Sequence, residues 1–427
     1  DRYLDLTHSS IRCGIEFERL IVGLTSAHWG VYEFAVKNGK ITKMKPFSED
    51  PDPSPIGPSI IDLLDDPLRI KAPAVRESWL KNGPGSAPEK RGSDPFVTIG
   101  WDEAERLVAI ELDRVRTTHG NQAIYAGSYG WASAGRFHHA QSQIHRFLNA
   151  IGGYTKSVNT YSFAAAEVMM PHVIGDFRNY TYNQTSWASV IANTELFVAF
   201  GGVPLRNGQI GQGGVGRHIQ RDSILAAHEN GVKFISISPL KSDMDDGVQA
   251  TWLPIRPNTD TALIVALCYE LLDKQLYDRN FLDRYTVGFD KFSEYLRGTH
   301  DGIAKTAEWA SAICDMRADD ICRLAAQMAT HRTMLSLSWS LTRQAHGEQP
   351  FWAGVVLAAM LGQIGLPGGG FGFGYSATNT VGNNFHRNMP IADLPQGSNP
   401  IKSFIPVARI ADMLESPGTD FTYNGAT

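Results

Sequence analysis

Cysteine is scarce in this chain. Of its 427 residues only four are cysteine, Cys13, Cys268, Cys314 and Cys322, and no two of them form a CxxC pair. Closely spaced cysteines are the usual ligands of zinc sites and iron–sulfur clusters. The spacing therefore argues against a zinc site or an iron–sulfur cluster supplied by this chain. Cys314 and Cys322 are expected to be buried apolar groups rather than a disulfide.

Long apolar runs and an excess of basic charge are also missing. No apolar run approaches the ~18 residues that cross a bilayer, so no transmembrane segment is predicted. The first residues show no twin arginine and no small-residue cleavage site, so no export signal is visible, although a cleaved mature chain would look the same. With 39 basic and 44 acidic residues the net charge is −5. Nucleic acid is an improbable partner for such a surface.

The composition is that of a globular protein, with 43% hydrophobic and 19% charged residues. A chain of this length is expected to form two or three domains of about 100 to 200 residues. Residues 1–100 are rich in Pro, Gly and Ser and predict a loop-rich, partly β N-terminal region. Residues 101–190 predict the first half of an α/β domain, and residues 191–427 a Rossmann-like, dinucleotide-binding α/β domain.

Short apolar runs alternate with helical patterns from residue 101 onward. Runs that end in Gly, Ser or Pro occur at residues 122–127, 195–202, 232–239 and 333–340. Such runs are typical of parallel strands that are buried on both faces. Helical spacing separates them, at residues 217–231, 259–276 and 318–331. The fold class that follows is α/β, with doubly wound parallel sheets.

Polar residues follow these strands, where ligands of doubly wound sheets bind. The four segments that follow the strands are predicted to contact a nucleotide through phosphate, ribose or base. The candidate residues are Gly130, Trp131, Arg206, Ser238, Pro239, Ser340, Arg343, His346 and Gln349.

A glycine motif offers a rival interpretation. Gly211, Gly213 and Gly216 satisfy the GxGxxG pattern before a helix. An NAD site needs its first glycine in the turn that ends the strand, and this motif begins about ten residues later. The next strand also ends in Ser238 rather than in the acid that would bind a ribose. A surface loop is therefore favoured over an NAD site.

Asp260 is expected at the start of a helix, in the stretch "IRPNTDTAL". An acid in a first helical turn usually complements the helix dipole. The functional alternative is base recognition, because a carboxylate accepts from both N1–H and N2–H of guanine, a pattern that adenine does not offer. Both interpretations stay open on the residues alone.

Several ordered blocks together carry a family resemblance. They include "AGSYGW", "NTYSFAAAEVMMPHVIG", "IRPNTDTAL", "SLSWSLTRQAHGEQPFW" and "LGQIGLPGGGFGFGY". In these blocks the chain resembles the dimethyl sulfoxide reductase family of molybdopterin enzymes, nearest to the trimethylamine N-oxide, dimethyl sulfoxide and biotin sulfoxide reductases. The resemblance runs from about Thr25 to the last residues.

The resemblance implies a molybdenum cofactor, bis(molybdopterin guanine dinucleotide), and no iron–sulfur cluster. Ser162 matches the family's metal ligand, as a hard oxygen donor where relatives carry Cys. The alternative for Ser162 is a helix N-cap. Tyr129 and Trp131 are implied as catalytic residues over the metal, with Tyr129 donating a hydrogen bond to the transferring oxygen and Trp131 forming a wall of the pocket. Asp260 and the residues after the strands are implied as dinucleotide contacts.

The implied activity is oxygen-atom transfer from an S-oxide or N-oxide substrate of the dimethyl sulfoxide, trimethylamine N-oxide or biotin/methionine sulfoxide type. An external electron donor, such as a cytochrome, a quinol-linked protein or a thiol-linked protein, is expected, and a periplasmic location is favoured over a cytoplasmic one. Two residues depart from the pattern of the family. Arg206 stands where several relatives have a lysine, and Phe163 stands where the reductases often have a small polar residue.

The family's C-terminal β-barrel is expected to be absent, so the chain is interpreted as an N-terminal portion. The alternatives are a non-catalytic, cofactor-holding subunit of a split enzyme, or a serine-ligated enzyme that acts on hydroxylated aromatics.

Overall fold

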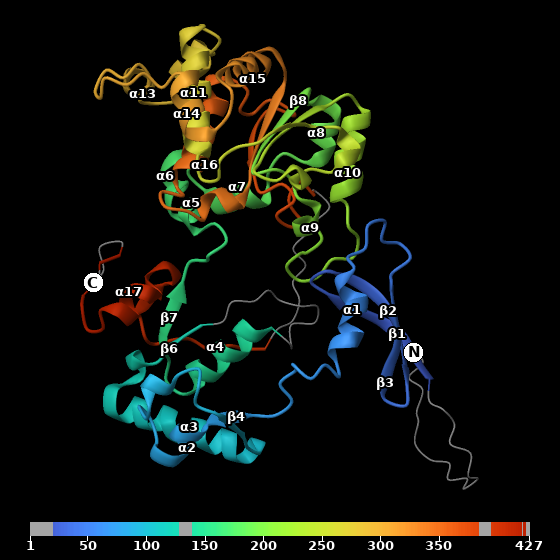
Figure 1. Cartoon of the computed structure of the whole chain (residues 1–427), viewed down its shortest axis with the longest axis vertical. Helices are drawn as coiled ribbons and strands as arrows, with labels where there is room; N and C mark the ends of the chain where they lie inside the picture. Colours follow the sequence, from blue (N-terminus) through green and yellow to red (C-terminus); the bar gives the residue numbers. More distant parts are fainter. Residues whose placement is uncertain (1–19, 128–138, 384–393, 421, 424–427) are drawn as a thin grey trace.

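The computed structural model describes residues 20–127, 139–383, 394–420 and 422–423. Within them the chain forms three main sheets. The hairpin sheet has the order β1-β2-β3, the small sheet β13-β7-β6 and the central sheet β10-β9-β8-β11-β12. A short antiparallel pair, β4 (Ala74–Arg76) with β5 (Phe96–Thr98), lies before the small sheet in the sequence. Figure 1 shows the central sheet and its helices at one end of the molecule and the small sheet at the other.

The hairpin sheet consists of β1 (Leu20–Ala27), β2 (Gly30–Lys37) and β3 (Lys40–Pro46), all antiparallel. Asn38 and Gly39 form the tight turn between β2 and β3, and both have positive φ, 50° and 77°. An Asn-Gly pair tolerates this left-handed backbone, which matches the twist of a two-residue hairpin. Helix α1 (Ile56–Leu63) follows the sheet.

The small sheet joins segments that are far apart in the sequence. It contains β6 (Tyr125–Ala126), β7 (Thr155–Val158) and β13 (Phe404–Pro406), and both pairings are parallel. The predicted strand at residues 122–127 is therefore shorter than expected, because residues 121–123 form a 3-10 turn. Helices α2 (Glu77–Asn82), α3 (Trp101–His119), α4 (Ala140–Ala150) and α17 (Ile410–Glu415) belong to this end of the molecule (Figure 1). The domain boundaries at residues 100 and 190 stay predictions, but part of the zone 191–427 pairs with β7.

The central sheet is parallel throughout. Its strands are β8 (Leu196–Phe200), β9 (Lys233–Ile237), β10 (Thr251–Leu253), β11 (Thr333–Leu337) and β12 (Gly370–Phe373). The expectation of an α/β fold with parallel sheets is confirmed. Along the chain, β9 and β10 are added on one side of β8, and β11 and β12 are then added on its other side. The direction of winding therefore reverses between β8 and β11.

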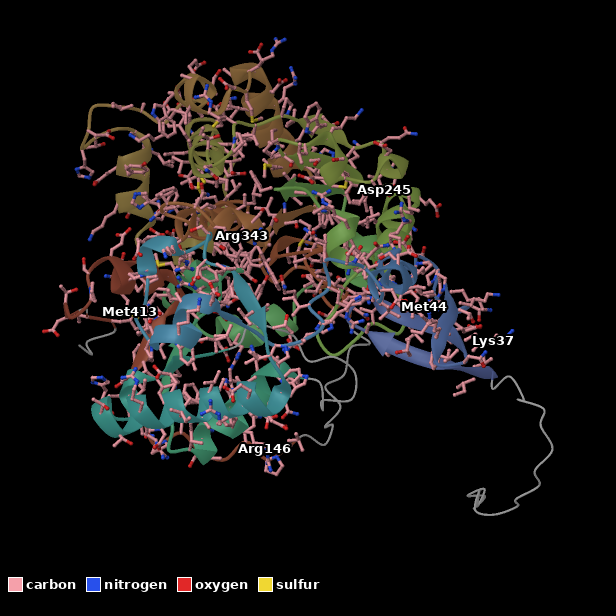
Figure 2. All side chains as sticks on the ribbon, turned by 60° about the horizontal axis from the view of Figure 1, so that its bottom comes forward. Lys37, Met44, Arg146, Asp245, Arg343 and Met413 are labelled. Carbon is pink, nitrogen blue, oxygen red and sulfur yellow. The ribbon has the colours of Figure 1, made fainter. Side chains whose placement is uncertain are left out.

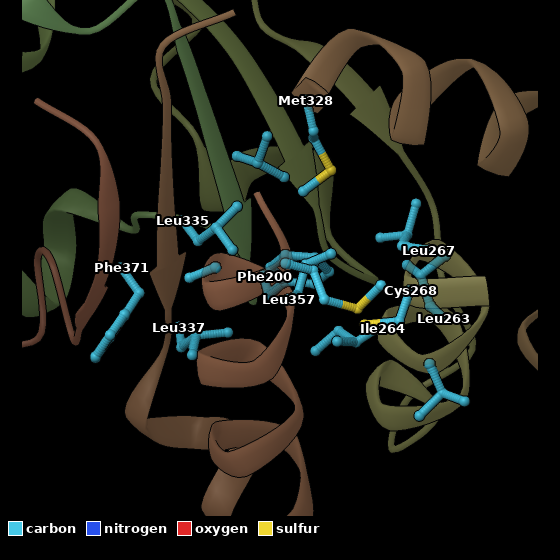
Figure 3. Packing of buried hydrophobic residues seen from close by; sticks show 14 of the residues in the cluster. Phe200, Leu263, Ile264, Leu267, Cys268, Met328, Leu335, Leu337, Leu357 and Phe371 are labelled. Atoms are coloured by element: carbon cyan, nitrogen blue, oxygen red, sulfur yellow. The ribbon is translucent and has the colours of Figure 1, made fainter. Parts of the chain in front are cut away.

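Two hydrophobic clusters cover the two faces of the central sheet. Val198 and Phe200 point into a large cluster with α11 (Asp260–Asp273), α15 (Ala318–Thr330) and α16 (Gln349–Met360). The alternate residues Phe197 and Ala199 point into a second cluster with α8 (Trp187–Asn193) and α10 (Gln220–Glu229). Period-two alternation between two apolar layers explains why these strands read as continuous apolar runs. Figure 3 shows the packing of the larger cluster.

The remaining helices surround the larger cluster or connect it to the small sheet, except α9 (Leu205–Gly208), whose Leu205 packs against the second cluster. They are α5 (Ala164–Met169), α6 (Pro171–Ile174), α7 (Phe177–Tyr182), α9 (Leu205–Gly208), α12 (Arg279–Tyr285), α13 (Phe289–Leu296) and α14 (Ala307–Cys314).

Candidate functional site: the carboxyl edge of the central sheet

The carboxyl ends of the central strands gather the predicted nucleotide contacts at one edge. Because β8, β9, β10 and β11 are parallel, the residues that follow them lie along the same side of the sheet. Arg206 follows β8, Ser238 and Pro239 follow β9, and Asp260 follows β10. Ser340, Arg343, His346 and Gln349 follow β11. In doubly wound sheets the ligand crevice lies where the winding reverses, which here is between β8 and β11.

The turns after β8 and β11 touch at this reversal. Gly201 has a φ of 83°, and a Cβ on it would lie 2.6 Å from the Cβ of Ser338. Only glycine combines the left-handed backbone with this close approach. The hydroxyls of Ser338 and Ser340 are 2.9 Å apart across the same turn. The reversal point is therefore lined by hydroxyls and bare backbone, which are the groups that phosphates contact.

Asp243 connects the turn after β8 to the turn after β9, and the sequence analysis missed it. The Ser238 hydroxyl donates to its Oδ2 at 2.5 Å, and the Arg206 guanidinium donates to its Oδ1 at 2.5 Å. The backbone N–H of Val203 also donates to the Asp243 carbonyl at 2.7 Å. The sequence signal was an acid five residues after Ser238, which a 3-10 turn at 241–243 brings back to the Ser238 hydroxyl.

Asp260 is buried at the first position of α11. Its side chain is 3% exposed, and its Oδ1 has no hydrogen-bond partner among the described residues. Burial raises the pKa of the Asp260 carboxyl to about 6, because the charged form loses its hydration. An acid that only complements a helix dipole is normally solvated, so this burial favours the base-recognition alternative. An unsatisfied buried carboxylate can accept from a donor pair such as that of guanine.

Ser162 lies between β7 and α5. The N-cap position of α5 belongs to Phe163 rather than to Ser162, and the Phe163 side chain makes no capping hydrogen bond. The guanidinium of Arg343 donates to the backbone carbonyl of Ser162 at 3.0 Å, and Figure 2 labels Arg343. This contact brings the predicted metal ligand to the turn that follows β11.

A cleft of about 510 Å³ opens next to Ser162. Tyr161, Ala164, Arg343, Val407 and Tyr423 are among its lining residues. The hydroxyl of Tyr161 donates to the carbonyl of Val407 at 2.6 Å, which ties one wall of the cleft to the segment after β13. The cleft thus lies between the central sheet and the small sheet.

The other predicted contacts are exposed, partly exposed or outside the described residues. Pro239 and His346 are exposed, and His346 has a φ of 57° in the turn before α16. Gln349 is the first residue of α16. Tyr129, Gly130 and Trp131 fall at residues 128–138, outside the described part of the chain, so their roles stay predictions.

The GxGxxG motif packs against the hairpin sheet. The N–H of Gly211 donates to the carbonyl of His28 at 2.8 Å, and the N–H of Val215 donates to that of Ala27 at 3.4 Å. The backbone of this loop is therefore engaged in contacts with the β1–β2 turn rather than lying in the turn that ends β8. This placement agrees with the loop interpretation.

Two properties of the described residues bear on the type of site. Among these residues no group of three or more His, Cys, Asp or Glu side chains is arranged to hold a metal ion. In the same part of the chain, no helix has the length and apolar character required to cross a membrane. A metal held mainly by an organic cofactor and one serine would need no such cluster.

Comparison with known families defines the class. The family model of the molybdopterin oxidoreductases matches residues 69–418, and the model of the molybdopterin oxidoreductase N-terminal domain matches residues 25–65. The chain belongs to the molybdopterin oxidoreductase family, in the dimethyl sulfoxide reductase group. Membership implies a molybdenum cofactor carried by molybdopterin.

Individual relatives are named for reduction of S-oxides and N-oxides. The biotin sulfoxide reductase of Cereibacter sphaeroides is 45% identical over 382 residues, which are 90% of this chain and 51% of that protein. The dimethyl sulfoxide/trimethylamine N-oxide reductase of the same organism is 40% identical over 95% of this chain and 50% of its own length. The trimethylamine-N-oxide reductase of Haemophilus influenzae is 39% identical, with coverages of 94% and 50%. The chain spans about half the length of these relatives.

A solved structure supports the fold. Acetylene hydratase from Pelobacter acetylenicus superposes with a TM-score of 0.52 at 21% identity, over 80% of this chain and 44% of that protein. At this identity the similarity concerns the fold alone.

Proposed function

We propose that this chain forms the cofactor-binding part of a molybdenum-dependent oxidoreductase that reduces an S-oxide or an N-oxide. Its cofactor is bis(molybdopterin guanine dinucleotide), without an iron–sulfur cluster, and Ser162 is the protein ligand of the metal. The observation that carries this proposal is the Arg343–Ser162 contact, because it joins the predicted ligand to the sheet edge where dinucleotides bind. The names of the relatives support the substrate class.

The described residues fit a guanine dinucleotide at two points. The orphaned Oδ1 of Asp260 lacks the donors that guanine N1–H and N2–H would provide. Arg206 and Ser238, both held by Asp243, offer a cation and a hydroxyl at the turns after β8 and β9. Ser340, Arg343, His346 and Gln349 extend the same edge toward Ser162, as contacts for phosphate and sugar.

When bound, the cofactor supplies oxygen-atom-transfer chemistry, and the chain supplies orientation and electrostatics. Ser162 would offer a hard oxygen ligand. Tyr129 would donate a hydrogen bond to the oxygen that leaves the substrate, and Trp131 would form a wall of the pocket. An external protein donor would deliver electrons, and the periplasm is the proposed compartment.

Metal and nucleotide analysis tests the proposal together with an activity assay. The protein, purified with its cofactor, should contain close to one molybdenum per chain and release about two GMP on hydrolysis, as two dinucleotides require. It should oxidise a reduced dye with dimethyl sulfoxide, trimethylamine N-oxide or biotin sulfoxide. Purified protein without molybdenum and without GMP would exclude the cofactor assignment. A loaded protein that reduces none of these oxides would exclude the substrate class.

A further inference from the structure

Ser162 and its neighbour Phe163 are each contacted by the same turn. The turn is the 3-10 helix η5 (Trp339–Thr342) and the residue that follows it, Arg343. Arg343 donates to the Ser162 carbonyl at 3.0 Å. The ring of Phe163, the next residue after Ser162, packs on the ring of Trp339 with centroids 4.3 Å apart.

We propose that Arg343 and Trp339 are positioning residues, which act with Phe163 to fix the Ser162 segment against the turn that follows β11. The inference rests on the proposed function, because the purpose of the fixed segment is to present the Ser162 oxygen to the metal. It differs from a ligand role, since neither Arg343 nor Trp339 has to touch the metal.

Phe163 packs against the larger hydrophobic cluster and so anchors the backbone next to Ser162. Its ring meets Phe177 edge-on at 6.2 Å, and Phe177 meets Phe373 of β12 at 5.5 Å. Phe373 in turn stacks on Phe351 of α16 at 4.3 Å. Close-packed rings in a core have few alternative positions. The backbone at Ser162 is thus one residue away from a side chain anchored in the larger cluster.

Trp339 packs closely against the backbone of Gly374. Gly374 has a φ of 78°, and a Cβ at that position would lie 2.1 Å from the Trp339 Nε1. The bare backbone of Gly374 therefore lets the indole pack where a side chain would exclude it. The N–H of Gly374 donates to the carbonyl of Leu337, which ties this close approach to the end of β11.

The size of the Phe163 side chain makes both of its ring contacts possible. A small polar side chain could not span to Trp339 or reach Phe177. In this chain the aromatic contact complements the Arg343 hydrogen bond, so that the carbonyl of Ser162 and the side chain of its neighbour are held from the same turn. Motion of the Ser162 oxygen then requires both contacts to loosen.

Two matched pairs of variants test the proposal. Arg343→Gln is compared with Arg146→Gln, because the Arg146 guanidinium also donates to a distant backbone carbonyl, that of Pro395 at 2.6 Å (both arginines are labelled in Figure 2). Trp339→Leu is compared with Trp309→Leu, since both tryptophans are partly buried against the same cluster. Arg343→Lys and Trp339→Phe serve as conservative rescues.

The first measurement is amide hydrogen exchange of residues 159–166 in the purified full chain, and it does not depend on activity. Arg343→Gln and Trp339→Leu should raise exchange in this segment by roughly tenfold or more, because local opening becomes easier. The controls Arg146→Gln and Trp309→Leu should leave it unchanged, even where they lower the melting temperature. Equal exchange in test and control variants would overturn the proposal.

The second measurement is X-ray absorption at molybdenum in the loaded enzyme, with kcat and KM. In the two test variants the metal–oxygen shell should broaden and kcat should fall on the order of tenfold to a hundredfold at similar KM, as expected for a misplaced group. GMP content should stay constant in Trp339→Leu, which removes no proposed dinucleotide contact, and this separates positioning from loss of the dinucleotide. An unchanged shell and kcat would contradict the positioning role. If Ser162→Ala keeps the same metal–oxygen shell, the proposed ligand fails, while the exchange result still decides whether the turn fixes the segment.

Discussion

Helices α11 and α3 show how differently the two ends of the molecule are built. Ten of the 14 residues of α11 are buried between the central sheet and neighbouring helices. Among the 19 residues of α3, all of them described, none is buried, and Trp101 and Val108 are mostly exposed. Both segments carry helical sequence patterns, so the pattern alone does not determine burial. A helix becomes a core element only where a second layer covers it.

The largest expected effect concerns a buried pair that joins the segment after the hairpin sheet to the loop before α10. His218 Nδ1 lies 2.6 Å from the Asp50 carboxylate and its Nε2 lies 2.9 Å from the Gln209 carbonyl, with both side chains buried. Removing one partner of a buried ion pair costs about 3 to 5 kcal/mol. Asp50→Asn should lower the free energy of unfolding by this amount in urea titrations.

The control is an exposed ion pair, Arg279 with Asp283 at 2.9 Å. Arg279→Gln should change the unfolding free energy by about 0 to 1 kcal/mol. If the two substitutions cost the same, the Asp50–His218 pair does not hold the hairpin sheet in place.

A direct comparison of the two helices comes next in size. Leu267 of α11 is fully buried, and Leu267→Ala should cost about 2 to 5 kcal/mol through lost contacts and a residual cavity. Val108 of α3 is 57% exposed, and Val108→Ala should change stability by no more than about 0.5 kcal/mol. Thermal unfolding followed by calorimetry checks both. A large loss for Val108→Ala would mean that α3 is covered in the purified protein.

The elements around the central sheet were easier to predict from the sequence than those around the small sheet, because the central sheet is covered on both faces. Strands buried on both faces are continuous apolar runs, so β8, β9 and β11 could be placed within a few residues. Asp260 could be placed at a helix start because its flanking residues change pattern there. The site's hydrogen-bond network could not be predicted, since Asp243 reaches Ser238 only through a 3-10 turn. Strand β13 was also missed, because three residues give no periodicity and its partner β7 lies about 250 positions earlier.

A smaller effect is the dependence of the free energy of unfolding on pH through Asp260. Its pKa in the folded chain, about 6, exceeds the usual 3.8, so the folded state holds more protons than the unfolded state between these values. The stability of the cofactor-free chain should therefore fall as the pH rises from about 4 to 6, by on the order of 2 to 3 kcal/mol. Asp260→Asn should remove this slope. Urea midpoints at pH 4.5 and pH 7 measure the difference, and equal slopes in both proteins would contradict it.

The same titration predicts nucleotide selection. The proposed contact to guanine uses the carboxylate form of Asp260, so GMP should bind more tightly above about pH 6 than below it. AMP should show no such gain, and Asp260→Asn should bring the affinities of GMP and AMP together. A GMP affinity that does not respond to pH or to Asp260→Asn would show that the carboxylate does not recognise the base.

The central proposal is that Ser162, which lies where the small sheet meets the turn after β11, is the protein ligand of the metal. X-ray absorption at the molybdenum edge, on the loaded wild type and on Ser162→Ala, tests this most directly. The account predicts that Ser162→Ala loses one oxygen neighbour of the metal and its turnover while its melting temperature stays close to that of the wild type. An identical oxygen shell with full turnover would contradict the central claim.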